Sequence, residues 1–264
     1  MSDDPVLLSV QGPVATIVLN RPERLNTFTP ALLEALLAVL DEVAGLDGVR
    51  VVVLTGAGTA FCAGGDLREG LGTMLGEGSV AERTAQLRRS TAATQRLRNL
   101  PQVTVAAING ACAGAGLSLA LACDLRVAHA KATFATGFLT AGVSGDFGGA
   151  WLATRLLGAS RAAELYLLNE RFDAKEALRL GLVTKVHADR AFGEGVNEVV
   201  SGLLARAPMA LALLRANLRD AEDLGLAAYL DAETERQVVT MSTDDAAEAA
   251  AAFLAKRPPR FTGR

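Results

Sequence analysis

The sequence predicts an α/β fold, with an α/β core over residues 1–190 and a helical region over residues 191–264. Apolar stretches of strand length run three times into loops rich in glycine, within residues 49–66, 103–116 and 133–149. Long apolar strands are typical of parallel sheets whose two faces are both covered. From residue 189 onward every segment is typical of a helix, with one break at Pro208.

Local signals place the elements of the first half of the chain. Glycine and proline between two apolar runs predict a hairpin, and threonine followed by proline predicts a capped helix start. A helix with several arginines ends before Pro101. These elements are expected at residues 6–10 and 14–19 (hairpin), 29–45 (helix), 49–54 (strand), 81–99 (helix) and 103–108 (strand).

The second half begins with a tight turn that leads into a buried helix starting near Ala115. Asp173 and Glu176 have the spacing of a capping box, and Gly181 is a typical helix end. The three junctions between strands and glycine loops recur irregularly, which favours stacked turns over a strict repeat. Further elements are expected at residues 125–128 (strand), 150–157 and 160–168 (helices) and 183–186 (strand).

Composition and charge exclude several classes of function. The net charge is −3, which gives no basic surface for a nucleic acid. The sequence has no uninterrupted apolar run of membrane-spanning length, and its first residues lack the pattern of a signal peptide. Three cysteines without a CxxC pair are expected to be reduced core thiols. We expect a cytoplasmic protein with neither a nucleic acid nor a membrane as partner.

Several catalytic motifs are absent from the sequence. No Gly-Lys pair, no GxGxxG and no HExxH occur, so we expect neither nucleotide chemistry nor a metal site. Ser118 and His129 suggest a hydrolase pair, since a serine nucleophile needs a nearby base. A helical serine bonded to its own backbone fits Ser118 better.

The glycine-rich junctions carry the chemistry that the sequence predicts. Gly110, Gly114 and Gly116 surround the start of the helix near Ala115, where free N–H groups and the positive end of the dipole meet. The loop around Ala63 supplies a second backbone N–H after a buried strand. Two such donors on one oxygen form an oxyanion hole, worth about 3 kcal/mol per donor in the transition state. A packing turn is the alternative interpretation of residues 103–116.

These motifs resemble the crotonase superfamily, the enoyl-CoA hydratase/isomerase enzymes, over essentially the whole chain. The resemblance implies a spiral of ββα turns with a helical C-terminal region that forms a homotrimer or a dimer of trimers. The motifs that carry it are Asn20-Arg21-Pro22 with Leu25-Asn26, Thr55-Gly56 with Phe61-Cys62-Ala63-Gly64-Gly65-Asp66-Leu67, Ala107-Ile108-Asn109-Gly110 with Gly114-Ala115-Gly116, Cys123-Asp124, Gly142 with Gly148-Gly149, and Ala177 with Gly181-Leu182-Val183.

The resemblance also implies site residues and a substrate. The oxyanion donors would be the N–H groups of Ala63 and Ala115, and the substrate an acyl-CoA thioester. No separate cofactor is expected, because coenzyme A is part of the substrate. For Lys256 the alternative is a solvated basic tail. The residues expected to contact the substrate are Arg24, Leu25, Ala63, Gly64, Gly65, Asp66, Gly114, Phe138, Lys256 and Phe261.

The sequence departs from the hydratase pattern at two positions. Hydratases of this family carry two glutamates, and here those positions hold Ser118 and Phe138. Hydration needs a base and an acid on one water molecule. Asp146 resembles instead the catalytic aspartate of dienoyl-CoA isomerases and of ring-opening epoxyphenylacetyl-CoA isomerases, and also the nucleophile of chlorobenzoyl-CoA dehalogenases.

We therefore expect a double-bond isomerase of fatty-acid or related acyl-CoA metabolism, with Asp146 as the proton shuttle. A helix cap is the alternative role for Asp146. Two alternatives stay open for the whole chain. One is a hydratase-type lyase with an atypical site, and the other is a non-catalytic homologue that binds acyl-CoA.

Overall fold

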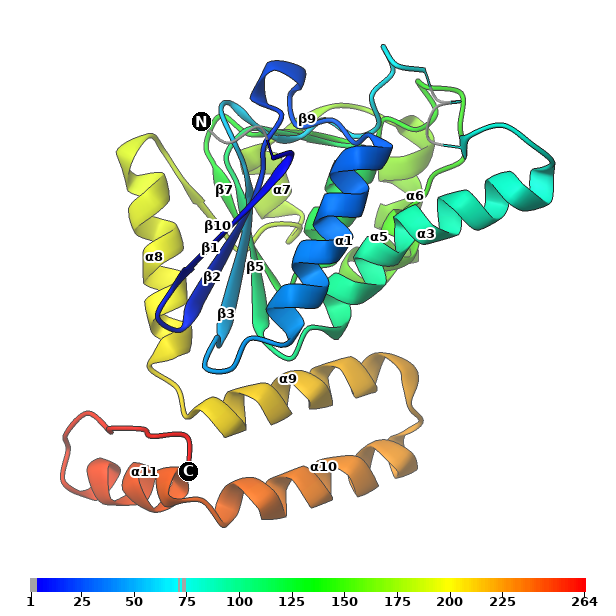
Figure 1. The fold of residues 1–264 in the computed structure, drawn as a ribbon. Helices are drawn as coiled ribbons and strands as arrows, with labels where there is room; N and C mark the ends of the chain where they lie inside the picture. The colour runs from blue at the N-terminus through cyan, green and yellow to red at the C-terminus, as the bar shows by residue number, and fades with distance from the viewer. Residues whose placement is uncertain (1–3, 71, 73–74) are drawn as a thin grey trace. The chain divides into compact units, whose positions relative to one another are not determined.

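A six-stranded sheet runs through the first of two compact units in the computed structural model, which describes residues 4–70, 72 and 75–264 (Figure 1). The hairpin strands β1 and β2 are antiparallel, and every other pair in this sheet is parallel. The order is β1 (Val6–Gln11), β2 (Val14–Leu19), β3 (Val51–Gly56), β5 (Val103–Ile108), β7 (Leu125–His129) and β10 (Lys185–His187).

A smaller sheet of four short strands lies beside the large one in the fold. Its order is β4 (Ala60–Cys62), β6 (Ala111–Ala113), β8 (Thr133–Ala135) and β9 (Phe172–Asp173). Strands β4, β6 and β8 pair in parallel, and β9 closes the edge antiparallel to β8. The sequence pattern treats β4 and β6 as loop and turn, because three-residue strands have no periodicity and exist through pairing with distant segments.

Three turns of strand, strand and helix build the core. Each turn places one strand in the large sheet and the next in the small sheet, and then a helix follows. The turns are β3–β4–α3 (Val80–Asn99), β5–β6–α4 (Ala115–Leu121) and β7–β8–α5 (Gly149–Leu157). This arrangement confirms the expected crotonase-like spiral.

Helix α1 (Pro30–Ala44) shows how local signals and packing agree. The Thr29 hydroxyl oxygen accepts the N–H of Leu32 at 3.2 Å, which caps the helix where the sequence predicts. Leu33, Leu36 and Leu40 face the core and are fully buried. This unit also contains the 3₁₀ helix η1 (Pro22–Arg24), α6 (Ala159–Leu168) and α7 (Ala174–Arg179).

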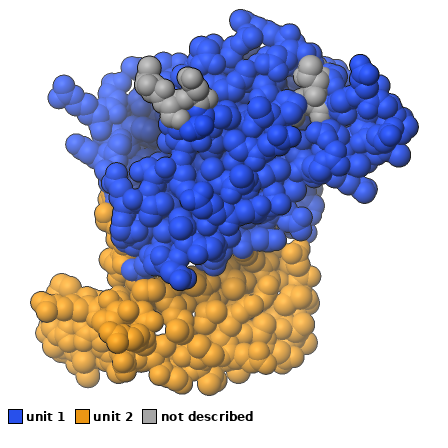
Figure 2. Space-filling model, in the orientation of Figure 1, with its two compact units in different colours: residues 1–197 blue, residues 198–264 orange. Residues whose placement is uncertain are grey.

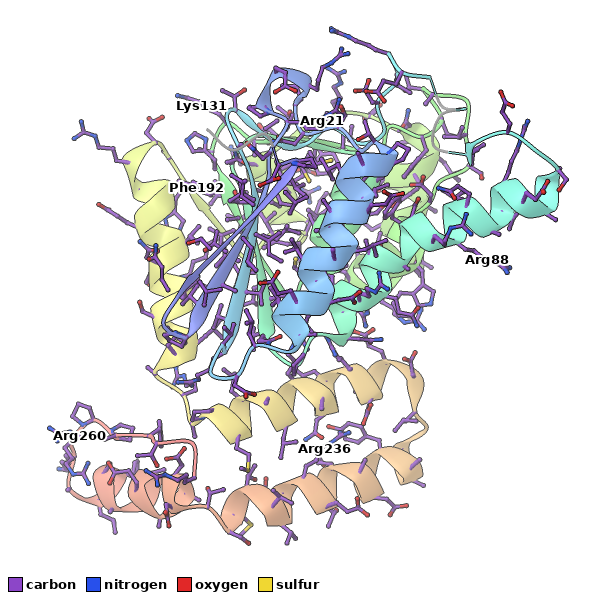
Figure 3. The ribbon with its side chains drawn as sticks, viewed as in Figure 1. Arg21, Arg88, Lys131, Phe192, Arg236 and Arg260 are labelled. Atoms are coloured by element: carbon purple, nitrogen blue, oxygen red, sulfur yellow. The ribbon has the colours of Figure 1, made fainter. Side chains whose placement is uncertain are left out.

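Residues 198–264 form the second unit (Figure 2), and the division falls within α8 (Arg190–Leu204). Arg236 joins two of its helices by bonds to Asn217 (2.7 Å) and Asp220 (2.6 Å) (Figure 3). The predicted helical character of this region is confirmed, while its role in oligomerisation stays a prediction. Its helices are α9 (Pro208–Asp223), α10 (Leu226–Met241) and α11 (Asp244–Leu254).

Membrane-spanning length was considered for every helix in the described part of the chain. None of these helices is individually both long and apolar enough to cross a membrane. The sharply bent pair α8 and α9 passes that test when taken together, by length and composition only.

Candidate active site

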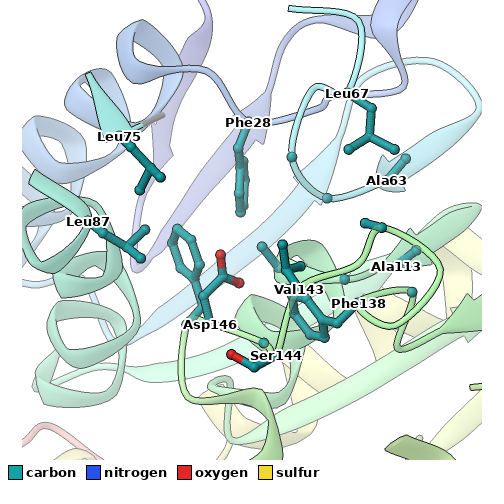
Figure 4. Close-up of a pocket in the computed structure, with 18 residues that line it drawn as sticks. Phe28, Ala63, Leu67, Leu75, Leu87, Ala113, Phe138, Val143, Ser144 and Asp146 are labelled. Carbon is teal, nitrogen blue, oxygen red and sulfur yellow. The ribbon is translucent and has the colours of Figure 1, made fainter. Parts of the chain in front are cut away.

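A cavity of about 260 Å³ lies among the glycine-rich loops of the three turns (Figure 4). Its wall is apolar, with Phe28, Leu87 and Phe138 among the larger side chains. Among the described residues that line it, Asp146 is the single ionisable one. The cavity therefore places one carboxyl group among hydrocarbon surfaces, as a small-molecule site with few polar groups does.

The Asp146 carboxyl group lies in the loop between β8 and α5. Burial raises its pKa from 3.8 to about 6. Its Oδ1 atom is buried, and no described residue donates a hydrogen bond to it. A carboxyl group that titrates near neutrality can both accept and return a proton. Helix α5 is capped by Gly148 without a side-chain bond, so Asp146 is not a helix cap.

Two polar side chains hold the backbone immediately after the Cα atom of Asp146. The Ser118 hydroxyl lies 3.3 Å from the carbonyl oxygen of Asp146. The Thr94 hydroxyl donates to the carbonyl oxygen of Phe147 at 3.0 Å. Phe147 has a φ of +50°, a left-handed conformation that a side chain of this size rarely adopts. The surrounding contacts therefore fix an unfavourable backbone next to the acidic residue.

The N-terminus of α4 forms another part of the wall. Gly114 precedes the helix with a φ of +54°, and no side chain caps the helix start. The N–H of Ala115 has no acceptor within the described residues, and Ala115 lines the cavity. This arrangement agrees with the predicted donor at Ala115, whose role in catalysis stays a prediction.

The N–H of Ala63 has a different environment from that predicted. It donates to the carbonyl oxygen of Leu25 at 3.1 Å, so this donor is already occupied. Leu25 lies 38 positions earlier in the chain, and no local pattern indicates this bond. The catalytic assignment of Ala63 stays a prediction, against which this hydrogen bond counts.

Within residues 63–66 of this loop, Gly65 is the one whose N–H lacks an acceptor among the described residues. It pairs with Phe28 in an isolated parallel bridge. Phe28 donates to the carbonyl oxygen of Gly64 at 2.8 Å, and Asp66 donates to that of Phe28 at 3.1 Å. Neighbouring N–H groups of an extended chain point to opposite sides, so the Gly65 N–H points away from Phe28.

The two glycine loops touch at Gly64 and Gly114. A Cβ atom on Gly64 would lie 3.1 Å from the carbonyl oxygen of Ala113 and 3.6 Å from the nitrogen of Ala115. Gly64 also has a φ of +95°, which favours glycine. The close approach brings Gly65 and Ala115 to the same cavity wall, as expected for two loops that act together.

The remaining predicted contact residues fall into two groups. Gly64, Gly65, Gly114 and Phe138 line the cavity. Arg24, Leu25 and Asp66 lie outside its lining, and Lys256 and Phe261 belong to the second unit.

The Asp66 carboxylate has a structural environment. Burial acts to raise its pKa, but hydrogen bonds from the Thr27 hydroxyl (3.0 Å) and from the backbone of Arg68 (3.1 Å) and Glu69 (3.4 Å) hold that pKa below its ordinary value. These bonds, with the ion pair to Arg21 at 3.4 Å, tie the loop before α1 to the loop after β4. A role for Asp66 in binding stays a prediction.

The structure separates the possible hydrolase pair. The Ser118 hydroxyl lies 3.3 Å from the carbonyl oxygen of Gly114 in its own helix, which is the backbone bond that the sequence predicts. The imidazole of His129 instead contacts the backbone N–H groups of Lys131 (3.0 Å) and Asp189 (3.1 Å). His129 therefore does not serve as a base for Ser118.

The described residues offer neither a reactive thiol nor a cluster of metal ligands. All three cysteines are buried, and burial raises the pKa of the Cys62 thiol to about 12. Within the described residues, no three His, Cys, Asp or Glu side chains are grouped so that they could hold a metal ion.

The sequence pattern gives no sign of two polar residues behind the cavity, Thr94 and Tyr166. Thr94 lies on the buried side of α3, and the Tyr166 ring stacks on Phe138 with centroids 6.2 Å apart. Both occur in helical segments whose periodicity indicates packing alone. Their proximity to the Asp146 loop depends on contacts between helices that are distant in sequence.

Comparison with known proteins shows similarity over the whole chain. The family model described as enoyl-CoA hydratase/isomerase matches residues 9–264. The chain is 35% identical over 259 residues to 1,2-epoxyphenylacetyl-CoA isomerase from Escherichia coli (strain K12), covering 98% of both chains. It is 33% identical over 259 residues to 2,3-dehydroadipyl-CoA hydratase from the same strain, covering 98% of this chain and 99% of the relative.

Comparison with a solved structure also shows similarity over nearly the whole chain. The chain matches the crystal structure of enoyl-CoA hydratase from Bacillus anthracis with a TM-score of 0.90 and 31% sequence identity. The match covers 98% of this chain and 100% of the other. The names of these relatives include both isomerases and hydratases.

Proposed function

The chain belongs to the enoyl-CoA hydratase/isomerase family, and we propose that within this family it shifts the double bond of an enoyl-CoA thioester. The observation that carries the proposal is the position of Asp146, the single ionisable side chain among the described residues of an apolar cavity. Hydration requires a base and an acid on one water, whereas one carboxylate suffices to move a proton between two carbons.

The reaction begins with Asp146 as a carboxylate. It removes a proton from C2 of a 3-enoyl thioester, and the electron pair of that C–H bond moves toward the thioester oxygen, which gives a dienolate. The N–H groups of Gly65 and Ala115 donate to this oxygen and stabilise its negative charge. The protonated Asp146 then returns the proton to C4, and the product is the 2-enoyl thioester.

Binding of the substrate follows the same proposal. Coenzyme A is part of the substrate, and the chain needs no separate cofactor for this proton transfer. We assign Arg24 and Leu25, in the loop before α1, to the binding of coenzyme A. Contact of Lys256 and Phe261 with coenzyme A stays a prediction from the family resemblance. Assembly as a homotrimer or a dimer of trimers and a cytoplasmic location are part of the proposal.

A direct assay tests the proposed reaction. Wild type, Asp146→Asn and the control Asp41→Asn are incubated with 3-enoyl-CoA, 2-enoyl-CoA and an aromatic epoxy-CoA. Asp41 is an exposed carboxylate in an ion pair with Arg96, so its loss should leave the rate unchanged. We expect Asp146→Asn to slow isomerisation by about 10²- to 10⁴-fold, the usual contribution of a general base.

Two outcomes would contradict this function. Rapid hydration of 2-enoyl-CoA that persists in Asp146→Asn would favour a hydratase with an atypical site. Tight binding of the thioesters without turnover of any of them would favour a non-catalytic homologue that binds acyl-CoA.

A further inference from the structure

Two hydroxyl groups meet behind the loop that carries Asp146, outside the lining of the cavity. Ser118 belongs to α4, Tyr166 to α6, and Gly149 begins α5 between them. A Cβ atom on Gly149 would overlap both hydroxyl oxygens, so both lie against the same backbone position. The absence of a side chain at Gly149 therefore leaves the space in which the two hydroxyls face each other.

The Tyr166 hydroxyl lacks a hydrogen bond of ordinary geometry. Its oxygen is buried, and no described residue is placed as its partner. A buried hydroxyl without a partner is costly, so an adjacent group that can accept its proton is expected to do so. Burial raises the pKa of Tyr166 to about 12, the nearby Ser118 hydroxyl opposes this rise, and the charge of Asp146 adds to it. Tyr166 therefore stays protonated and acts as a donor.

Ser118 connects this donor to the acidic residue. Its hydroxyl oxygen lies 3.3 Å from the carbonyl oxygens of both Gly114 and Asp146. A serine hydroxyl has one proton to donate and lone pairs to accept another bond. When Tyr166 donates to the Ser118 hydroxyl, the serine can donate to the backbone carbonyl oxygen of Asp146. Linked hydrogen bonds of this kind strengthen one another.

The next carbonyl group of the loop is held independently. Thr94 donates to the carbonyl oxygen of Phe147 at 3.0 Å, one residue after the carbonyl that Ser118 contacts. Successive carbonyl groups are thus bound by two different helices, α4 and α3. Both contacts lie just after the Cα atom from which the Asp146 side chain leaves the backbone, so loss of either contact would change the direction in which its carboxylate points.

We propose that Tyr166 is a positioning residue for Asp146, acting through the hydroxyl of Ser118. The proposal rests on the proposed function, in which Asp146 moves the proton. A misplaced carboxylate slows the proton transfer without weakening substrate binding, since catalytic groups need accurate placement in the transition state. Neither hydroxyl touches the substrate in this arrangement.

The variant Tyr166→Phe tests the role of the hydroxyl and keeps the ring that stacks on Phe138. We expect kcat for isomerisation to fall about 10-fold, with KM within about twofold of wild type and little change in Tm. Ser118→Ala should give the same division between kcat and KM. The double variant should lose no more than the larger single loss, because both changes break one chain of hydrogen bonds.

Tyr229→Phe is the matched control, because it removes the hydroxyl of the other tyrosine in the sequence. Tyr229 lies in the second unit and donates to Glu233 at 2.7 Å. We expect its kcat and KM to equal those of wild type. If Tyr166→Phe fails to fold, the kcat and KM of Ser118→Ala decide the proposal alone.

Several results would overturn the assignment. An unchanged kcat in Tyr166→Phe and Ser118→Ala, in an enzyme whose activity depends on Asp146, overturns the positioning role alone. Losses of kcat that add fully in the double variant, or a loss confined to KM, also overturn it. A wild-type chain without isomerase activity overturns the proposed function first, which separates the two failures.

Discussion

Asp146 combines an acidic side chain with surroundings that disfavour its charge. Because burial raises its pKa to about 6, the carboxylate form that accepts a proton predominates only above that pH. We expect kcat/KM for isomerisation to rise with pH through about 6 and then to level off. A pH profile of wild type checks this. A profile that is flat between pH 5 and 8 would contradict the role of Asp146 as the base.

The same burial predicts a cost to stability. In the unfolded chain Asp146 ionises at its ordinary pKa, whereas in the folded chain ionisation is disfavoured up to about 6. Asp146→Asn should therefore raise the free energy of unfolding by about 3 kcal/mol at pH 8, where the wild-type group is charged in both states. The gain should shrink as pH falls through 6 toward 4. Urea unfolding at several pH values measures it, and an equal gain at all pH values would exclude this cause.

Gly64 and Gly65 are neighbours with opposite tolerance for a side chain. Alanine at Gly64 meets the carbonyl oxygen of Ala113 at 3.1 Å and a φ of +95°, while Gly65 has open space around its Cβ direction. We expect Gly64→Ala to lower the free energy of unfolding by more than 1 kcal/mol, and Gly65→Ala to change it by roughly 0.5 kcal/mol or less. Equal effects in thermal unfolding would show that the two loops do not press together at Gly64.

At the scale of elements, the helix caps and buried strands were predictable because their signals are local. Thr29 before Pro30, and Asp173 before Glu176, mark helix starts that the structure confirms. Strand β5 is buried over its whole length and lies at the expected residues 103–108, and β3 (Val51–Gly56) overlaps the strand expected at 49–54. These patterns depend on residues that are near one another in sequence.

The rest of the site could not be read from local patterns. The bond from Ala63 to Leu25, which leaves Gly65 as the unoccupied donor within residues 63–66, joins segments that meet only through the fold. The short strands β4 and β6 likewise exist through pairing with each other. Asp146 could be identified from the sequence because an aspartate at this position resembles the catalytic aspartate of known isomerases. Tyr166 lies in an ordinary helical sequence that carries no such motif.

The cap of α1 gives a prediction at this scale. Thr29→Ala removes the acceptor for the Leu32 N–H, and we expect a loss of about 1 kcal/mol in the free energy of unfolding. Thr29→Ser, which keeps the hydroxyl oxygen, should retain most of that free energy. Denaturant titration of both variants checks this, and an equal loss in the two would point to the missing methyl group instead.

For the whole molecule, the prediction concerns assembly. The chain has a mass of 27.4 kDa. We expect light scattering after size-exclusion chromatography to give three or six times this mass, the homotrimer or dimer of trimers that the family resemblance implies. A monomer at micromolar concentration would contradict the predicted role of the helical second unit in oligomerisation.

In the proposed mechanism, each of the three strand–strand–helix turns supplies a different catalytic group. The first and second turns supply the backbone donors at Gly65 and Ala115, and the third supplies the carboxylate at Asp146. A backbone donor persists through almost any substitution, whereas a carboxylate is one mutation away from being lost or relocated. Substitutions in the third turn, whether by evolution or by protein engineering, can therefore change the reaction, while the backbone donors that activate the thioester stay the same.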